Sequence, residues 1–191
     1  MPVDLIVFTA DRRIQGAIPL ADDRVSDMLN SVARVVIRNA RIDDLLEPAP
    51  PETADVTIPI AAIVAVLVSG RSGIQSRRRK TELHPVRVGI VRYVVSGWLH
   101  VAAGGKANLA SQNPALVLAG RDALVPLTEA RIAYDRVGEA VSEEAETILL
   151  NRGQATWIDV DEAAMGDGVE LFVEQPKVYH AAIAKDFTEP R

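Results

Sequence analysis

Ile14-Gln15-Gly16-Ala17-Ile18-Pro19-Leu20 has a counterpart later in the chain, Val95-Ser96-Gly97-Trp98-Leu99-His100-Val101. Both stretches alternate apolar and polar residues, which is typical of a half-buried strand. Both carry a glycine at the third position, and a glycine inside a strand indicates a bulge or a sharp bend. The chain therefore carries two versions of one bent strand.

Two further matches extend this repeat. Asn39-Ala40-Arg41-Ile42 is similar to Glu129-Ala130-Arg131-Ile132, and Thr57-Ile58 is similar to Thr147-Ile148. Each copy then holds about five short strands in roughly 70 residues, a pattern typical of a small, strongly bent barrel. We predict a mainly β protein made of two tandem small bent β-barrels, with a short C-terminal extension.

Changes in composition along the chain divide it into four parts. We predict a first barrel over residues 1–70, a basic linker over 71–85, a second barrel over 86–162 and the extension over 163–191. Two readings of the linker stay open: a solvated connector, or a contact for anions or nucleic acid, since clustered arginine neutralises phosphate well. No aromatic residue for base stacking lies in its basic run, whose charged residues are Arg71, Arg77, Arg78, Arg79 and Lys80.

Composition narrows the class of protein. The 191 residues are 48% hydrophobic but only 4% aromatic, so aliphatic side chains must fill the core. No cysteine is present, which excludes disulfides, thiolate metal sites and cysteine catalysis. The net charge of -5 argues against a general nucleic-acid coat. The N-terminus lacks the features of a signal peptide and no apolar run is long enough to span a bilayer, so we expect a cytoplasmic protein without membrane contact.

At this point the sequence resembles the Sm-like (LSm-type) family of small β-barrels, in particular uncharacterised bacterial proteins with tandem domains. The resemblance rests on the central glycine of the second strand, on Asp27-Met28-Leu29-Asn30, on Thr128-Glu129-Ala130 and on Leu150-Asn151-Arg152-Gly153. It implies RNA-contacting roles for Asp27, Asn30, Arg152 and Gly153. Neither copy carries the full pair of motifs, because Ile60-Ala61-Ala62 and Lys106-Ala107-Asn108-Leu109 stand where the missing ones belong.

The search for catalytic chemistry gives no credible set of residues. The three histidines lie in different parts of the chain without metal-ligand spacing, and the paired carboxylates fall at the ends of elements, where solvated roles are expected. We therefore predict no catalytic residues, no metal site and no cofactor.

Two tryptophans distinguish the second copy from the first. Trp98 and Trp157 align with Ala17 and Leu67. They are either core fillers or anchors of an interaction surface, since tryptophan is frequent at interfaces.

These observations predict a non-catalytic binding or assembly module that self-associates or binds a protein partner. The alternative is an RNA-binding protein that uses Sm-like surfaces together with the linker residues Arg77, Arg78, Arg79 and Lys80.

Overall fold

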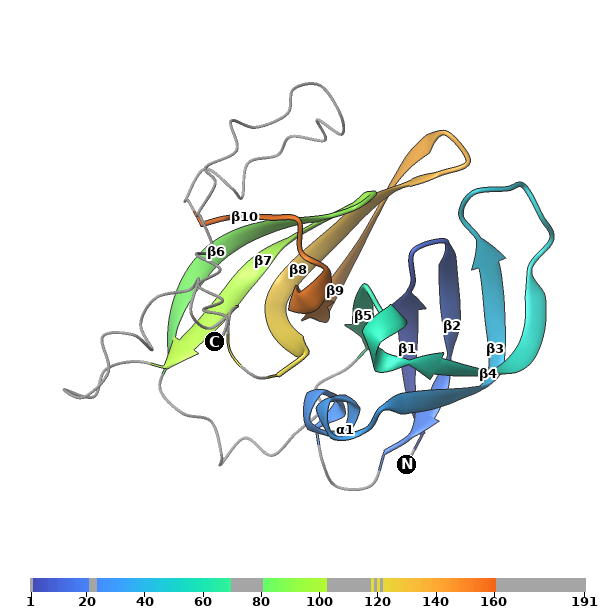
Figure 1. The fold of residues 1–191 in the computed structure, drawn as a ribbon, viewed down its shortest axis with the longest axis horizontal. Coiled ribbons are helices and arrows are strands. Elements are labelled where there is room, and N and C mark those ends of the chain that lie inside the picture. Colours follow the sequence, from blue (N-terminus) through green and yellow to red (C-terminus); the bar gives the residue numbers. More distant parts are fainter. Residues whose placement is uncertain are drawn as a thin grey trace, which may run out of the picture.

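The protein is built on one antiparallel sheet of ten strands (Figure 1). The computed structural model describes residues 2–20, 24–69, 81–102, 118, 120 and 122–160. The charged linker residues 71–80 and the predicted C-terminal extension 163–191 lie outside this part of the chain. Strand order across the sheet is β10-β6-β7-β8-β9-β5-β1-β2-β3-β4, so each half contributes five adjacent strands.

Each half follows the same succession of elements. Four strands are followed by a 3₁₀ turn and a short fifth strand, with a helix inserted after the second strand in the first half. The first half comprises β1 (Pro2–Phe8), β2 (Arg12–Pro19), α1 (Val25–Ser31), β3 (Arg34–Asp44), β4 (Glu52–Pro59), a 3₁₀ turn (Ile60–Ala62) and β5 (Ala65–Val68). The second comprises β6 (Thr81–Ile90), β7 (Tyr93–Ala102), β8 (Leu124–Arg136), β9 (Glu139–Asn151), a 3₁₀ turn (Arg152–Gln154) and β10 (Trp157–Asp159). Strand β6 begins inside the range that the sequence assigned to the linker.

The prediction of a mainly β protein is confirmed, but the ten strands form one sheet that does not close into a barrel. The reason is the pairing of β5. This strand pairs with β1 on one side and with β9 of the other half on the other side. A strand that has both neighbours has no free edge left for closing its own half.

Adjacent residues of a strand point to opposite faces of a sheet, and the two strands at the junction use both faces. Val66 and Val68 of β5 belong to the core of the first half, together with Leu149 of β9. Ala65 and Leu67 belong to the core of the second half. The two cores therefore lie on opposite sides of the β5–β9 junction, and this junction separates and supports both.

Gly16 and Gly97 occupy equivalent places in the two halves. Strand β2 shifts register against β3 just beside Gly16, and β7 shifts against β8 just beside Gly97. A Cβ atom on Gly16 would lie 2.5 Å from Ile37 Cγ2, and one on Gly97 would lie 2.7 Å from Ala130 Cβ. The close crossing of two strands thus requires glycine twice, as the alternation in the sequence indicated.

The neighbouring strand bends at matching residues as well. Asn39 on β3 and Glu129 on β8 both have positive φ, 48° and 47°. These two residues are the ones that the sequence comparison aligned. The match of Thr57-Ile58 to Thr147-Ile148 is wrong by two residues, because Ile58 and Leu150 each stand two residues before their 3₁₀ turns.

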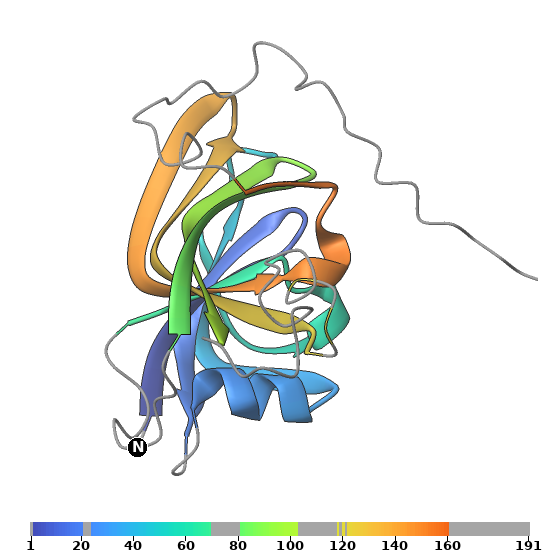
Figure 2. The same cartoon turned by 90° about the vertical axis from the view of Figure 1, so that its left-hand side faces the viewer.

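Helix α1 and the β8–β9 hairpin lie at opposite ends of the molecule (Figures 1 and 2). The short helix is attached to the second half through Asn30, whose side-chain amide donates to the carbonyl of Leu124 and accepts from its N–H, both at 2.9 Å. This contact joins the halves at the α1 end, in addition to the pairing of β5 with β9.

Candidate functional site

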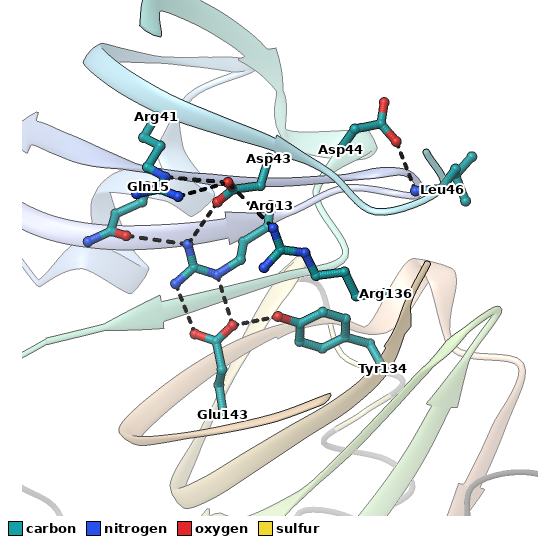
Figure 3. A network of polar contacts seen from close by, with 9 residues as sticks. All are labelled: Arg13, Gln15, Arg41, Asp43, Asp44, Leu46, Tyr134, Arg136 and Glu143. Atoms are coloured by element: carbon teal, nitrogen blue, oxygen red, sulfur yellow. Dashed lines mark hydrogen bonds and ion pairs between the residues drawn. The ribbon is translucent and has the colours of Figure 1, made fainter. Parts of the chain in front are cut away.

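A polar network joins the two halves near the β8–β9 hairpin (Figure 3). Arg13 of β2 donates from Nε and Nη2 to the two carboxylate oxygens of Glu143 on β9, at 2.8 and 3.1 Å. The hydroxyl of Tyr134 on β8 donates to the same carboxylate at 2.7 Å. The exposed side-chain fractions of Arg13 and Glu143 are 16% and 22%, so the pair is largely shielded from water.

Asp43 extends the network into the first half. This carboxylate is 4% exposed and faces three guanidinium groups. Arg13 Nη1 lies 3.4 Å away, Arg41 Nε 3.3 Å and Arg136 Nη2 3.8 Å. A buried carboxylate is costly unless it is paired and hydrogen-bonded, and these arginines supply that compensation.

The ionisation of Glu143 follows from these contacts. Burial raises its pKa, but the hydrogen bonds from Arg13 and Tyr134 and the charges of Arg13 and Arg136 outweigh burial, so the pKa is lowered. Burial raises the pKa of the Tyr134 hydroxyl, which the neighbouring Glu143 carboxylate raises further. A carboxylate held ionised by two donors is a weak proton acceptor, and the network is suited to joining elements rather than to acid–base catalysis.

A second polar contact fixes the junction itself. The side chain of Asn151, 4% exposed, donates to the carbonyls of Ile60 and Ile63 at 3.2 and 2.7 Å. Its oxygen accepts from the N–H of Gly153 at 3.1 Å. The end of β9 is thereby tied to the 3₁₀ turn of the first half.

The residues assigned to RNA by resemblance fall into three groups. Asn30 is engaged with Leu124, Gly153 donates to Asn151, and Arg152 Nη1 donates to the Leu118 carbonyl at 3.3 Å. Asp27 is exposed on α1. The linker residues Arg77, Arg78, Arg79 and Lys80 lie outside the described part of the chain. Among the described residues, the structure thus uses three of the candidates in local or inter-half contacts.

The two tryptophans lie in different surroundings. Trp157 occupies the place of Ala65, not of Leu67, because each stands three residues after the end of a 3₁₀ turn. It pairs with Gly89, whereas Ala65 pairs with Phe8. A Cβ atom on Gly89 would lie 2.0 Å from Trp157 Nε1. At this packing contact, the large residue lies on β1 in the first half (Phe8) and on β10 in the second half (Trp157), and the small residue lies on the partner strand in each case.

Trp98 is aligned with Ala17, as the sequence indicated. Ala17 lies between Asp4 and Arg38 on the neighbouring strands. Trp98 lies between Pro85 and Thr128 in the same arrangement. The same surface position therefore carries a methyl group in the first half and an indole ring in the second.

A groove of about 1060 Å³ lies over this position in the first half. It follows the face of β1, β2 and β3 that points away from the first core. The side chains that give it chemical character are Asp4, Ile6, Gln15, Ala17, Arg38 and Arg41. A mixture of apolar and polar lining in an open depression suits ligand binding better than catalysis.

Sequence analysis did not predict the groove or the network. The difference between Ala17 and Trp98 is visible in the repeat, but the groove also depends on which residues of β1 and β3 flank Ala17. Arg13 and Glu143 are separated by 130 positions, and no local pattern relates them.

Within the described ranges, no group of three histidine, aspartate or glutamate side chains is placed to hold a metal ion. None of the described helices has the length and apolar character needed to cross a membrane.

Comparisons with protein-family models, with curated proteins and with solved structures gave no match for this chain.

Proposed function

We propose that this protein is a non-catalytic binding module made of two fused Sm-like units. Two observations support the kinship: five strands in each half, and a second strand bent at a glycine in both. The polar side chains that join the halves hydrogen-bond within the protein. Their carboxylates are paired with arginine, which does not favour proton transfer.

The groove on the first half is the proposed binding face. This proposal rests on the difference between Ala17 and Trp98, which occupy the same position in two similar halves. Trp98 is half-buried at the corresponding position of the second half, where it brings an indole ring in place of a methyl group. Among the described residues, a depression lies over this position in the first half, and it offers the proposed binding site.

A partner-capture experiment tests this function. The purified full-length protein is immobilised beside the variant Ala17→Trp, which places in the groove the side chain that the second half already carries at this position. We expect at least one ligand to be retained by the native chain and lost with the variant. A set of ligands unchanged by Ala17→Trp would contradict the groove, and turnover that depends on one side chain would contradict a non-catalytic role.

Self-association is the other expectation, and the surfaces to consider are β4 and β10, the outermost strands of the sheet in the described part of the chain. Pro59 and Asn151 each directly precede a 3₁₀ turn, and Leu67 and Asp159 each stand five residues after the end of one. A β4–β10 contact between two chains with the register of the β5–β9 junction would therefore place Pro59 where Asn151 stands and Asp159 where Leu67 stands. Pro59 has no N–H and no amide to donate, and Asp159 would face apolar neighbours. This comparison supports a different partner over a second copy of the chain.

RNA binding has less support as the function of the described surfaces. Asn30, Arg152 and Gly153 are engaged in local or inter-half contacts, and they would have to release these contacts to bind a nucleotide. The basic linker carries the remaining part of that hypothesis.

A further inference from the structure

We propose that the groove over β1, β2 and β3 binds a short acidic peptide segment of a partner protein, an assignment that rests on the binding function proposed above. Three features carry it: the arginines on β3, the apolar lining between them and β1, and the absence of aromatic residues from the lining.

Arg38 is the first of these features. Its side chain lines the groove, is exposed and makes no ion pair or hydrogen bond within the described part of the chain. A guanidinium group offers a planar fork of donors that matches a carboxylate. Arg38 can therefore bind a carboxylate without losing a contact to any residue in the described part of the chain.

Arg41 adds a second cation that is only partly neutralised. Its partner Asp43 is shared with Arg136 and with Arg13, which also binds Glu143, so Arg41 has only a share of one carboxylate. The Arg41 side chain remains 59% exposed. The groove lining thus holds two arginines and one carboxylate, Asp4, in a protein with a net charge of -5. This local excess of positive charge is complementary to acidic side chains.

The rest of the groove fits a peptide. Ile6 and Ala17 provide apolar surface, and Gln15 provides an amide that can donate or accept. The lining residues of β2 run from Gln15 to Pro19, a length of about 13 Å at roughly 3.3 Å per residue, which corresponds to about four residues of an extended chain.

The same lining is poorly suited to single-stranded nucleic acid. None of the lining residues is aromatic, so bases have no stacking platform. Asp4, which lines the groove beside Ala17, would repel a phosphate backbone that runs past the two arginines. A peptide can place an acidic residue at the arginines and an apolar or basic one beside Asp4.

The test is a selection of random octapeptides displayed on phage, with the native full-length protein as bait and Ala17→Trp for counter-selection. The enriched peptides, labelled with fluorescein, are then measured by anisotropy against the native protein, Arg38→Glu and Arg34→Glu. Arg34 is the matched control, because it is an exposed arginine on the same strand outside the groove. Thermal unfolding confirms that each variant is folded, and a labelled oligouridylate is measured in parallel.

We expect enrichment of peptides rich in glutamate and aspartate. Arg38→Glu should weaken their binding at least about tenfold, the effect of losing one charge-assisted contact, and Arg34→Glu should change it less than about twofold. Replacing the acidic residues of the peptide by their amides should weaken binding to a similar extent.

Three results would overturn the assignment: enrichment without acidic residues, equal effects of Arg38→Glu and Arg34→Glu, or oligouridylate binding that Arg38→Glu abolishes while no peptide is enriched. A ligand captured by the native chain and lost with Ala17→Trp, in the absence of acidic peptides, would leave the binding function standing and reject only the class of ligand.

Discussion

Replacing Glu143 by glutamine removes the charge that joins the two halves while keeping the size of the side chain. Glu143 accepts two hydrogen bonds from Arg13 and one from Tyr134. Exposed ion pairs contribute up to about 1 kcal/mol, and breaking a fully buried pair costs about 3–5 kcal/mol. With exposed fractions of 16% and 22%, the pair lies between these limits. We expect Glu143→Gln to lower the free energy of unfolding by about 2 kcal/mol.

Urea denaturation at pH 7 measures this loss, which should lower the midpoint by about 1 M for an m-value of about 2 kcal/mol/M. Glu144→Gln is the matched control, because Glu144 is the next residue on β9 and is exposed. Its effect should stay below about 0.5 kcal/mol. Equal midpoints for the native protein and Glu143→Gln would refute the idea that this ion pair stabilises the fold.

The pH dependence gives a second check on the same reasoning. The pKa of Glu143 in the folded protein lies below its ordinary value of 4.5. A carboxylate with a lowered folded pKa contributes stability above the unfolded pKa, and the contribution is lost as the pH falls through the folded pKa. The difference between the native protein and Glu143→Gln should therefore be full at pH 7 and close progressively below about pH 4.5. A difference that stays constant down to pH 3 would contradict an electrostatic origin.

Two further substitutions test the junction and the strand crossing. Asn151→Ala should cost about 2–3 kcal/mol in urea denaturation, because the carbonyls of Ile60 and Ile63 lose a buried donor; an unchanged midpoint would show that these contacts are dispensable. Gly97→Ala should cost about 1–3 kcal/mol, because the new Cβ would lie 2.7 Å from Ala130 Cβ and 3.1 Å from its Cα. Gly16→Ala should act in the same direction, and a stabilising effect of either change would contradict the close crossing.

The local features of the fold could be predicted from the sequence. Alternation and the glycines at positions 16 and 97 are properties of a few consecutive residues, and they indicated two bent strands in two copies of one unit. The match of Asn39 to Glu129 also holds in the structure, because both residues bend at the same place. The predicted alignment of β4 with β9 in the repeat was wrong by two residues. Thr57-Ile58 and Thr147-Ile148 are common residue pairs, so their similarity carries little information.

The arrangement of the halves could not be predicted in the same way. Whether β5 closes its own half or pairs with β9 depends on distant partners, and the apolar run of β5 is equally suited to both. The ion pair between Arg13 and Glu143 likewise depends on how the halves dock. For the candidate site, the sequence showed that Ala17 replaces a tryptophan, but it could not show that Arg38 flanks the resulting space.

The contact between β1 and β5, and its counterpart between β6 and β10, also has a historical consequence. One half pairs Phe8 with Ala65, and the other pairs Gly89 with Trp157. If both halves descend from one ancestral unit, a single replacement from either pair passes through an intermediate that is overpacked or has a cavity, and both are destabilising. The exchange of sizes thus indicates that the two positions changed in step after duplication. A chimera that moves only one of the two residues between the halves should be less stable than one that moves both.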